Sequence, residues 1–170
     1  IKKLISNKLK SSDLIYYFPN GYIDLLNLAL YESQKSLELR VKKTNIINLS
    51  LTKRIKKILT LRLEIFEEDK VFYKKTFYHL ILPQNSKVMK KNLYKTIDNM
   101  WYLAGDNSTD FSFYTKRITL AAIYINTLYV YYNKDIQHAR LSIDKNIERI
   151  SKIPIIKERF SFIKDSLPIF

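Results

Sequence analysis

The chain has 170 residues, of which 46% are hydrophobic, so it can bury a substantial core and is too apolar to remain disordered. It has two glycines, four prolines and no cysteine, which disfavours a many-turned β-sandwich and excludes disulfides and thiolate metal sites. The formal net charge of +14 suits phosphate groups, an anionic membrane surface or an acidic partner. A solvated surface in a chain rich in Lys, Ile and Asn explains the same charge equally well.

The first part of the chain predicts two short helical segments. Residues Ile1 to Leu9 form the first, and Ser11 to Asp13 form a turn with side chains that can cap a helix. The second segment runs from Asp13 to Phe18. It is stopped by Pro19, Asn20 and Gly21, which favour a turn.

Hydrophobic residues recur at helical spacing through the rest of the chain, so we expect an all-α bundle of longer helices. Pro83 separates two of these helices, and Gly105 is placed to end another. In the second long helix, Lys53, Arg54 and Arg62 are expected on the polar face. The expected ranges are Tyr22 to Lys42, Leu51 to Phe66, Asp69 to Leu82, Ser86 to Ala104, Phe111 to Asn133 and Asp135 to Ile150.

The helix expected at Phe111 to Asn133 is apolar nearly all round, which favours a central position in the bundle. Asp110 is a candidate N-cap for it. Its most apolar stretch, Ile118 to Tyr132, contains polar residues and is shorter than the ~20 residues that a membrane-spanning helix needs. The small side chains of Ala121 and Ala122 could leave room for a cavity beside this helix.

The last segment, residues 153–170, predicts a short amphipathic helix that restarts at Pro154. Such a helix can dock on its own bundle, on a partner or at a membrane interface, and the pattern leaves these alternatives open. The residues of its apolar face are Ile156, Phe160, Ile163 and Leu167.

Residues with catalytic or metal-binding chemistry are few. Asp135 and His138 would share one helical face, but a carboxylate-bridged metal centre needs several further ligands. No known nucleophile or zinc motif is present. We therefore expect no catalytic residue, no metal and no cofactor. An acidic cluster is expected to be a solvated helix boundary, and its members are Glu64, Glu67, Glu68 and Asp69.

One segment carries a long and specific pattern. Met100 to Phe111 reads Met-Trp-x-x-Ala-Gly-Asp-x-Ser-Thr-Asp-Phe, and it is followed by Tyr114 to Arg117 (Tyr-Thr-Lys-Arg) and Leu120 to Tyr124 (Leu-Ala-Ala-Ile-Tyr). This segment resembles the signature of the lipid-binding accessory family of ubiquinone biosynthesis (the Coq-nine type), known from mitochondria and alphaproteobacteria. Weaker similarity covers Tyr17 to Leu26 and His79 to Pro83.

The resemblance implies a TetR-regulator-like fold in three parts: a degenerate helix-turn-helix region at residues 1–21, a ligand-binding bundle at 22–152 and a C-terminal amphipathic helix at 153–170. It implies binding of isoprenoid quinone intermediates or another lipid, and their presentation at a membrane surface to the di-iron demethoxyubiquinone hydroxylase. By analogy with TetR-like bundles, we expect a homodimer. The AT-rich codon usage that the composition suggests favours an alphaproteobacterium, with the protein in the cytoplasm and peripheral to the inner membrane.

The resemblance also assigns residues to roles. Phe113 stands where the family's partner patch typically has tryptophan, which keeps a hydrophobic contact but loses the indole N–H donor. Asp110 is explained more readily as a helix cap than as a contact. The expected partner patch consists of Met100, Asp110, Phe113, Tyr114 and Arg117. The apolar pattern of the helix expected at Phe111 to Asn133, and not the resemblance, suggests the wall of a lipid cavity. The expected wall of this apolar lipid cavity consists of Trp101, Leu120, Ile123, Tyr124, Thr127 and Leu128.

The alternative function is a TetR-type transcriptional regulator. Its recognition stretch would be Asp13 to Tyr17, which offers mostly apolar groups and few donors to base edges. Lys2, Lys3, Lys8 and Lys10 could still contact phosphates. We therefore expect no nucleic acid partner. A hydrolase or oxidoreductase has no motif in its favour.

Overall fold

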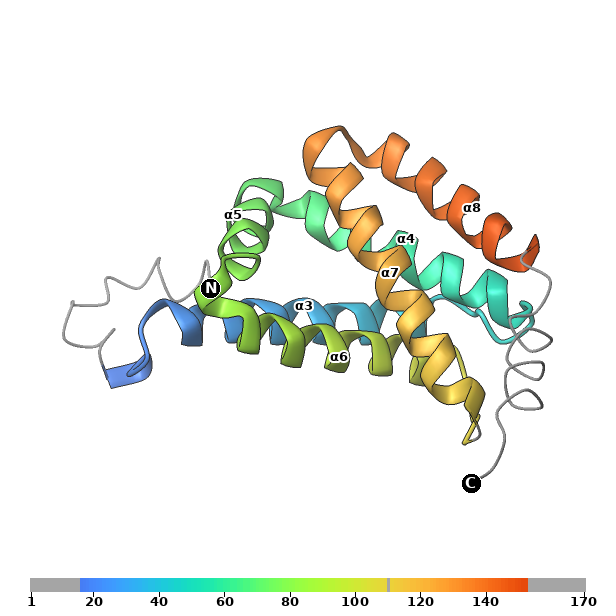
Figure 1. The fold of residues 1–170 in the computed structure, drawn as a ribbon, viewed down its shortest axis with the longest axis horizontal. Helices are drawn as coiled ribbons and strands as arrows, with labels where there is room; N and C mark the ends of the chain where they lie inside the picture. Colours follow the sequence, from blue (N-terminus) through green and yellow to red (C-terminus); the bar gives the residue numbers. More distant parts are fainter. Residues whose placement is uncertain (1–15, 110, 153–170) are drawn as a thin grey trace, which may run out of the picture.

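The computed structural model describes residues 16–109 and 111–152, and every complete regular element within these ranges is helical (Figure 1). This confirms the expected all-α, TetR-like bundle. The expected helix-turn-helix region lies mostly outside the described residues, as does the amphipathic segment with Ile156, Phe160, Ile163 and Leu167. The elements are α3 (Tyr22–Lys43), α4 (Leu51–Glu68), α5 (Lys70–Leu80), η1 (Pro83–Asn85), α6 (Ser86–Leu103), α7 (Phe111–Asn133) and α8 (Ile136–Lys152).

Local sequence signals set several of these boundaries close to where they were expected. Before α3, the Asn20 backbone N–H donates to Asp24 Oδ2 at 2.8 Å, so a first-turn carboxylate satisfies a free amide at the helix start. Gly21 adopts a φ of 61°, the left-handed region that glycine tolerates. Pro83 ends the connection after α5 and begins the short 3-10 turn η1.

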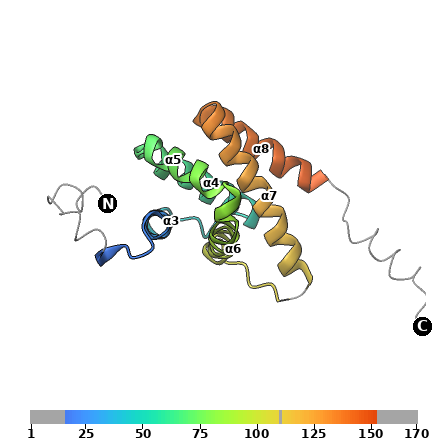
Figure 2. The same cartoon turned by 60° about the vertical axis from the view of Figure 1, so that its left-hand side comes forward.

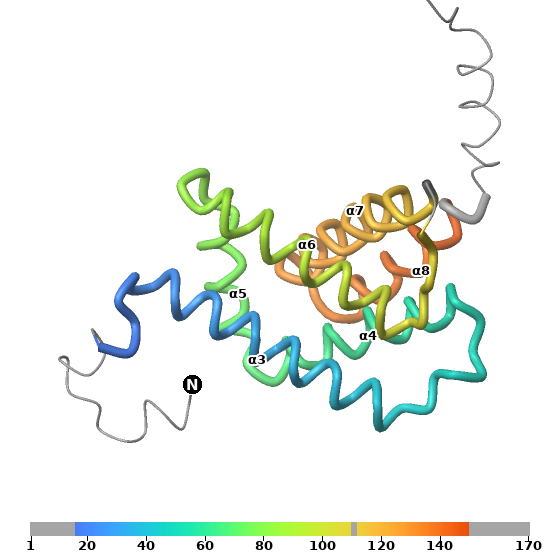
Figure 3. Tube along the Cα trace, turned by 90° about the horizontal axis from the view of Figure 1, so that it is seen from below, coloured from blue at the N-terminus to red at the C-terminus, as the bar shows by residue number. Residues whose placement is uncertain are grey.

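The helices are arranged as two pairs around α4. α3 and α6 pack side by side, and α7 and α8 form an antiparallel hairpin (Figures 1 and 3). When the molecule is turned, the hairpin lies on the far side of α4 from α3 (Figure 2). α4 contacts α3, α5, α6 and α8, so the first amphipathic helices and the hairpin share one core along it.

The expectation that α7 is the central helix is wrong, because α4 holds that place. α4 buries side chains on most of its circumference, including Ile58, Leu59 and Leu63. α7 buries one side and leaves apolar side chains such as Ile118 exposed on the other. No described helix combines the length and the apolarity needed to cross a membrane.

Arg62 and the acidic cluster also differ from expectation. Arg62 is fully buried instead of lying on a polar face. The glutamates of α4 are not merely solvated, because each ties α4 to another helix. Glu64 accepts from Arg140 of α8 at 3.0 Å, and the further pairs are Glu67 with Tyr131 of α7 and Glu68 with Arg40 of α3.

Candidate functional site

The junction between α6 and α7 begins with a well-formed helix end. The Gly105 N–H donates to the Tyr102 carbonyl at 2.9 Å, and the Asp106 N–H donates to the Trp101 carbonyl at 3.0 Å. These two bonds form a Schellman motif, which satisfies carbonyls that the end of a helix leaves free. Gly105 has a φ of 79°, as this motif requires, and the prediction that it ends the helix is confirmed.

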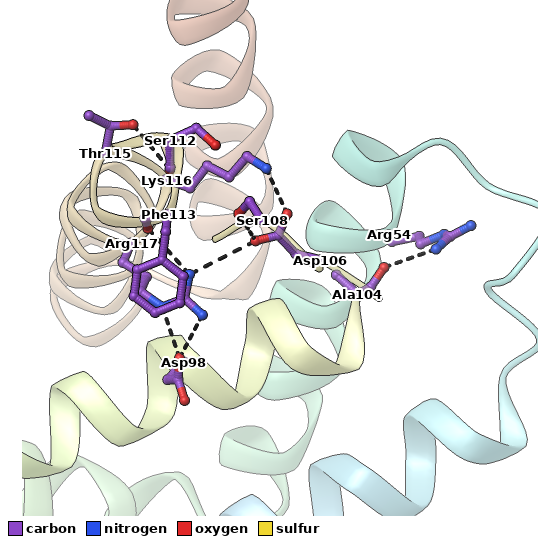
Figure 4. Close-up of polar contacts among 10 residues, drawn as sticks. All are labelled: Arg54, Asp98, Ala104, Asp106, Ser108, Ser112, Phe113, Thr115, Lys116 and Arg117. Carbon is purple, nitrogen blue, oxygen red and sulfur yellow. Dashed lines mark hydrogen bonds and ion pairs between the residues drawn. The ribbon is translucent and has the colours of Figure 1, made fainter. Parts of the chain in front are cut away.

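Arg54 of α4 fastens this helix end to the core. Its Nη1 donates to the Ala104 carbonyl at 3.0 Å (Figure 4). Its Nε donates to the Leu49 carbonyl at 2.9 Å. Its Nη2 donates to the Ile47 carbonyl. One guanidinium therefore joins the loop before α4 to the end of α6, and it leaves little space beside Gly105.

Replacing Gly105 with alanine is expected to lower the free energy of unfolding by about 1–2 kcal/mol, because a side chain disfavours the left-handed conformation. A Cβ at this position would also lie 3.0 Å from Arg54 Nη1. Gly21→Ala is the matched control, since Gly21 has a φ of 61° but no atom within 4 Å of an added Cβ. Urea unfolding should show the larger loss for Gly105→Ala. Equal losses would mean that the contact with Arg54 is unimportant.

Asp106 is the centre of the polar contacts beyond this helix end. Its side chain is 4% exposed, its Oδ1 accepts from Lys116 Nζ at 2.6 Å, and its Oδ2 accepts from Ser108 Oγ at 2.7 Å. Arg117 Nη1 lies 3.9 Å from the same carboxylate. Burial works to raise the pKa of Asp106, but the hydrogen bonds from Lys116 and Ser108 outweigh it, so the pKa lies below its ordinary value.

Arg117 connects this loop to α6 and to the first turn of α7. Its Nε and Nη2 donate to Asp98 Oδ1 at 2.8 Å and 2.7 Å, and its Nη1 donates to the Phe113 carbonyl at 3.2 Å (Figure 4). The guanidinium also lies over the Phe113 ring, 3.3 Å from its centroid. This stacking contributes cation–π attraction and fixes the ring orientation. The two cations of α7 therefore hold the start of α7 against the end of α6.

The structure separates the residues of the expected partner patch. Phe113 and Arg117 lie together, half-buried, and Tyr114 is 65% exposed beside them. Asp110 lies outside the described residues. The expectation that Met100 contacts a partner is wrong, because its side chain is fully buried in the core of the bundle.

Sequence reasoning singled out Tyr114 but missed the exposed apolar side chains that are aligned with it on α7. We call the four residues that follow the exposed stripe of α7. At 3.6 residues per turn they point within about 60° of one another. A soluble protein seldom exposes aligned large apolar groups without an interaction that covers them. The stripe consists of Tyr114, Ile118, Ile125 and Tyr129, which are 65%, 71%, 46% and 62% exposed.

A first cavity lies between α5, α6 and α7 and has a volume of about 150 Å³. Its lining is almost wholly apolar. Tyr124 and Leu128, two residues of the expected lipid wall, line it. Ile81 and Ile125 also line it and are about half exposed, so they mark where the cavity meets the surface.

The second cavity lies on the other side of α7, near α4 and α8, and has a volume of about 260 Å³. Trp101, Leu120 and Ile123 of the expected lipid wall line it. The buried Trp101 Nε1–H has no hydrogen-bond partner among the described residues. The expectation that Thr127 belongs to a cavity wall is wrong, because Thr127 is fully buried and lines neither of these two cavities. The expected single wall is therefore divided between two spaces that share no lining residue.

Only a weak signal for the Asp106 contacts can be found in the sequence. A carboxylate just after a helix-ending glycine and two adjacent cations, Lys116 and Arg117, were visible in the chain. Their pairing depends on how α6 and α7 approach each other, which spacing alone does not reveal.

The aspartate considered as a metal ligand, Asp135, pairs with His138 at the surface, and the carboxylate oxygen lies 2.8 Å from the imidazole Nδ1. No group of three potential metal ligands occurs within the described residues.

Comparison with known proteins gives a consistent result. A family model described as COQ9 matches residues 87–153, which include almost all of α6, the α6–α7 junction, α7 and α8. The chain is 33% identical over 116 residues to the rat protein "Ubiquinone biosynthesis protein COQ9, mitochondrial", a match that covers 68% of this chain and 36% of the relative. The bovine protein of the same name is 34% identical over 119 residues, covering 68% and 35%.

A more distant relative is "Probable ubiquinone biosynthesis protein coq9, mitochondrial" of Dictyostelium discoideum, which is 30% identical over 92 residues, covering 54% of this chain and 30% of the relative. The matched part of the chain thus spans about a third of the length of these relatives. The residues matched by the family model include the signature around the α6–α7 junction. The chain belongs to the COQ9 family.

Proposed function

We propose that this chain is a non-catalytic lipid-binding protein of ubiquinone biosynthesis, which binds isoprenoid quinone intermediates and presents them to the demethoxyubiquinone hydroxylase at a membrane surface. Its relatives are named for this pathway and as mitochondrial proteins. That the protein is bacterial and lies in the cytoplasm at the inner membrane stays a prediction. So do its assembly as a homodimer and its contact with the membrane through the segment from Ile156 to Leu167.

The size and lining of the cavities support binding of part of a lipid. A dry apolar cavity of about 150 Å³ takes a group the size of a benzene ring, whereas whole drug-sized ligands occupy roughly 300–1,000 Å³. Neither cavity therefore encloses a complete polyprenyl chain. A ring or the first isoprene units would lie inside, and each buried methylene would stabilise the complex by ~0.8 kcal/mol. The rest of the tail would remain outside in contact with apolar surface.

The position of Ile125 is the single observation that favours presentation of the lipid to a partner over its storage in the bundle. It belongs to the exposed stripe of α7, and it also lines the first cavity. The cavity thus meets the surface at the stripe itself. A partner docked on Ile118 and Ile125 would cover the cavity mouth, and a ligand could pass to it without crossing water. The hydroxylase would then receive its substrate at the same surface that it recognises.

Filling the cavity that binds lipid is expected to weaken affinity for a decyl-tailed ubiquinone at least tenfold, because added side-chain atoms take the ligand's space. Leu93→Phe fills the first cavity and Thr119→Phe fills the second, and both positions are half-buried in the wild type. Isothermal titration calorimetry on delipidated protein measures the affinity. Trp101 is the only tryptophan and lines the second cavity, so quenching of its fluorescence reports binding there.

The two variants serve as controls for each other, since each leaves the opposite cavity unchanged. Loss of affinity in one variant and not the other assigns the site. A delipidated wild-type protein without measurable affinity for the quinone would contradict the proposed function. So would unchanged affinity in both variants.

A further inference from the structure

Arg62 of α4 is a buried cation with few partners. Its side chain is fully buried in the apolar core. Its Nε donates to the Tyr124 hydroxyl at 3.4 Å, near the long limit for a hydrogen bond, and neither Nη1 nor Nη2 has a partner within residues 16–109 and 111–152. A guanidinium carries five N–H donors and a permanent positive charge. Buried polar groups are nearly always satisfied, and an uncompensated buried charge is strongly unfavourable, so this arrangement requires an explanation.

No carboxylate of the described residues neutralises this charge. Arg62 takes part in none of the ion pairs found among them. The nearest acidic residues along α4 are engaged with other helices. Their partners are Arg140 for Glu64, Tyr131 for Glu67 and Arg40 for Glu68. The part of the chain that the structure describes therefore leaves the guanidinium without a counter-ion.

The guanidinium lies directly behind the wall of the first cavity. Arg62 Cζ is 4.9 Å from the centroid of the Phe66 ring, and Phe66 and Tyr124 both line that cavity. Tyr73 and Tyr132 line it too, and the positive charge of Arg62 acts on both hydroxyls. Burial raises the pKa of Tyr73 and Tyr132, and Arg62 partly opposes this rise. A buried cation and three tyrosine side chains, Tyr73, Tyr124 and Tyr132, thus lie at one part of an otherwise apolar cavity wall.

Tyr124 is suited to connect this charge with a bound molecule. Its oxygen accepts from Arg62, and its own hydroxyl proton is donated to no acceptor among the described residues. Because the Arg62–Tyr124 contact is long, little is lost when the Tyr124 side chain moves aside or its oxygen changes partner. An oxygen atom at this part of the cavity wall would then meet the Tyr124 hydroxyl and the two free guanidinium nitrogens.

We propose that Arg62 and Tyr124 form a head-group site that selects, for the first cavity, an amphiphile with a carboxylate head and an apolar body. A carboxylate matches the planar N–H fork of arginine in two parallel bonds and supplies the missing negative charge. A neutral alcohol or quinone oxygen could accept hydrogen bonds but would leave the charge uncompensated. This assignment rests on the proposed function, since it takes the first cavity as a lipid site, and it adds the chemistry of the head group.

Dodecanoate and dodecan-1-ol, which share a tail and differ in charge, test the proposal on delipidated full-length protein. We expect the wild type to bind dodecanoate at least tenfold more tightly than dodecan-1-ol by calorimetry at neutral pH. Arg62→Met keeps the apolar volume and should abolish this preference, and Tyr124→Phe should reduce it. Arg40→Met, which removes a surface arginine paired with Glu68, should retain it. Without ligand, Arg62→Met should unfold at a higher temperature than the wild type, because a buried unpaired charge is gone.

Several outcomes would overturn the head-group site. They are equal affinities for the two probes in the wild type, and a preference that survives Arg62→Met. A lower unfolding temperature of Arg62→Met would also count against it, since it would assign Arg62 a structural role, such as holding buried water. If Arg62→Met does not fold, Tyr124→Phe and Arg62→Lys decide, because both must weaken the preference. Binding of a decyl-tailed ubiquinone, measured in parallel, separates the two proposals. If the protein binds the quinone but shows no preference for the carboxylate probe, only the head-group site is overturned. If it binds the carboxylate probe but not the quinone, only the proposed function is contradicted.

Discussion

Replacing Asp106 with asparagine is expected to lower the free energy of unfolding by about 2–3 kcal/mol at neutral pH. Breaking a buried ion pair typically costs about 3–5 kcal/mol, because the remaining charge loses its partner. The loss should be somewhat smaller here, since Lys116 is 31% exposed and can reach water, and Arg117 keeps its bonds to Asp98. Asparagine preserves the size of the side chain and its acceptor oxygen. Urea unfolding followed by circular dichroism measures the change.

The difference in stability between the wild type and Asp106→Asn is expected to depend on pH. The folded pKa of Asp106 is lowered from the ordinary value of 3.8, so its ionised form is favoured by folding. Its contribution is fully present above that ordinary value and is lost as the pH falls through the lowered folded pKa. The difference in unfolding free energy between wild type and Asp106→Asn should therefore be constant from neutral pH to about pH 5 and should shrink towards about pH 2.

Asp135→Asn is the matched control for these measurements. Asp135 also pairs with a basic side chain, His138, but both are about half exposed at the surface. We expect a much smaller change in stability for Asp135→Asn than for Asp106→Asn. If the two variants lose the same stability, or if the Asp106→Asn difference does not shrink in acid, the Lys116–Asp106–Arg117 contacts do not hold the α6–α7 junction.

The helices and their ends were predictable because they depend on local chemistry. Apolar side chains at helical spacing marked each long helix, and Pro83 and Gly105 marked two boundaries through backbone restrictions that act within a few residues. The structure places Gly105 in the left-handed conformation for which it was singled out. Signals of this kind need no knowledge of how the helices pack.

Arg62 and α7 were misjudged for different reasons. Arg62 was grouped with Lys53 and Arg54 because of its charge, yet at 100° per residue it projects between Ile55 and Ile58, and it is buried with them. α7 is apolar on nearly every side, and this pattern fits both a central helix and a helix with one uncovered apolar face. α8 covers part of α7, and the opposite side stays exposed.

Some residues of the candidate site were predicted through the family resemblance, and others were not predicted. Phe113, Tyr114 and Arg117 were assigned from the family signature, and the structure places them together in the first turns of α7. Asp106 was not singled out, although it lies within that signature. Its importance comes from Lys116, one turn and a half into the next helix, and that contact exists only once α6 and α7 are folded against each other.

Placing a charge in the exposed stripe of α7 is expected to weaken binding to the cognate demethoxyubiquinone hydroxylase roughly thirtyfold. This corresponds to about 2 kcal/mol, the loss typical of a central contact residue. Ile118→Asp is the sharpest change, because Ile118 is 71% exposed and a carboxylate there remains hydrated in the free protein but must lose water in the complex. The fold should be unaffected. Surface plasmon resonance measures affinity, and thermal unfolding checks stability.

Leu39→Asp on α3 is the matched control, since Leu39 is 58% exposed and apolar but lies outside the stripe. Hydroxylase affinity should survive Leu39→Asp and fall with Ile118→Asp and, more weakly, with Tyr114→Ala. Light scattering during gel filtration separates this from self-association, because a stripe that joins two copies of the chain would give a dimer that Ile118→Asp converts to monomers. Unchanged hydroxylase affinity in Ile118→Asp would contradict a docking role for the stripe. Because Ile125 lines both the stripe and the first cavity, a docking role would also require that a bound hydroxylase slow the release of ligand from that cavity.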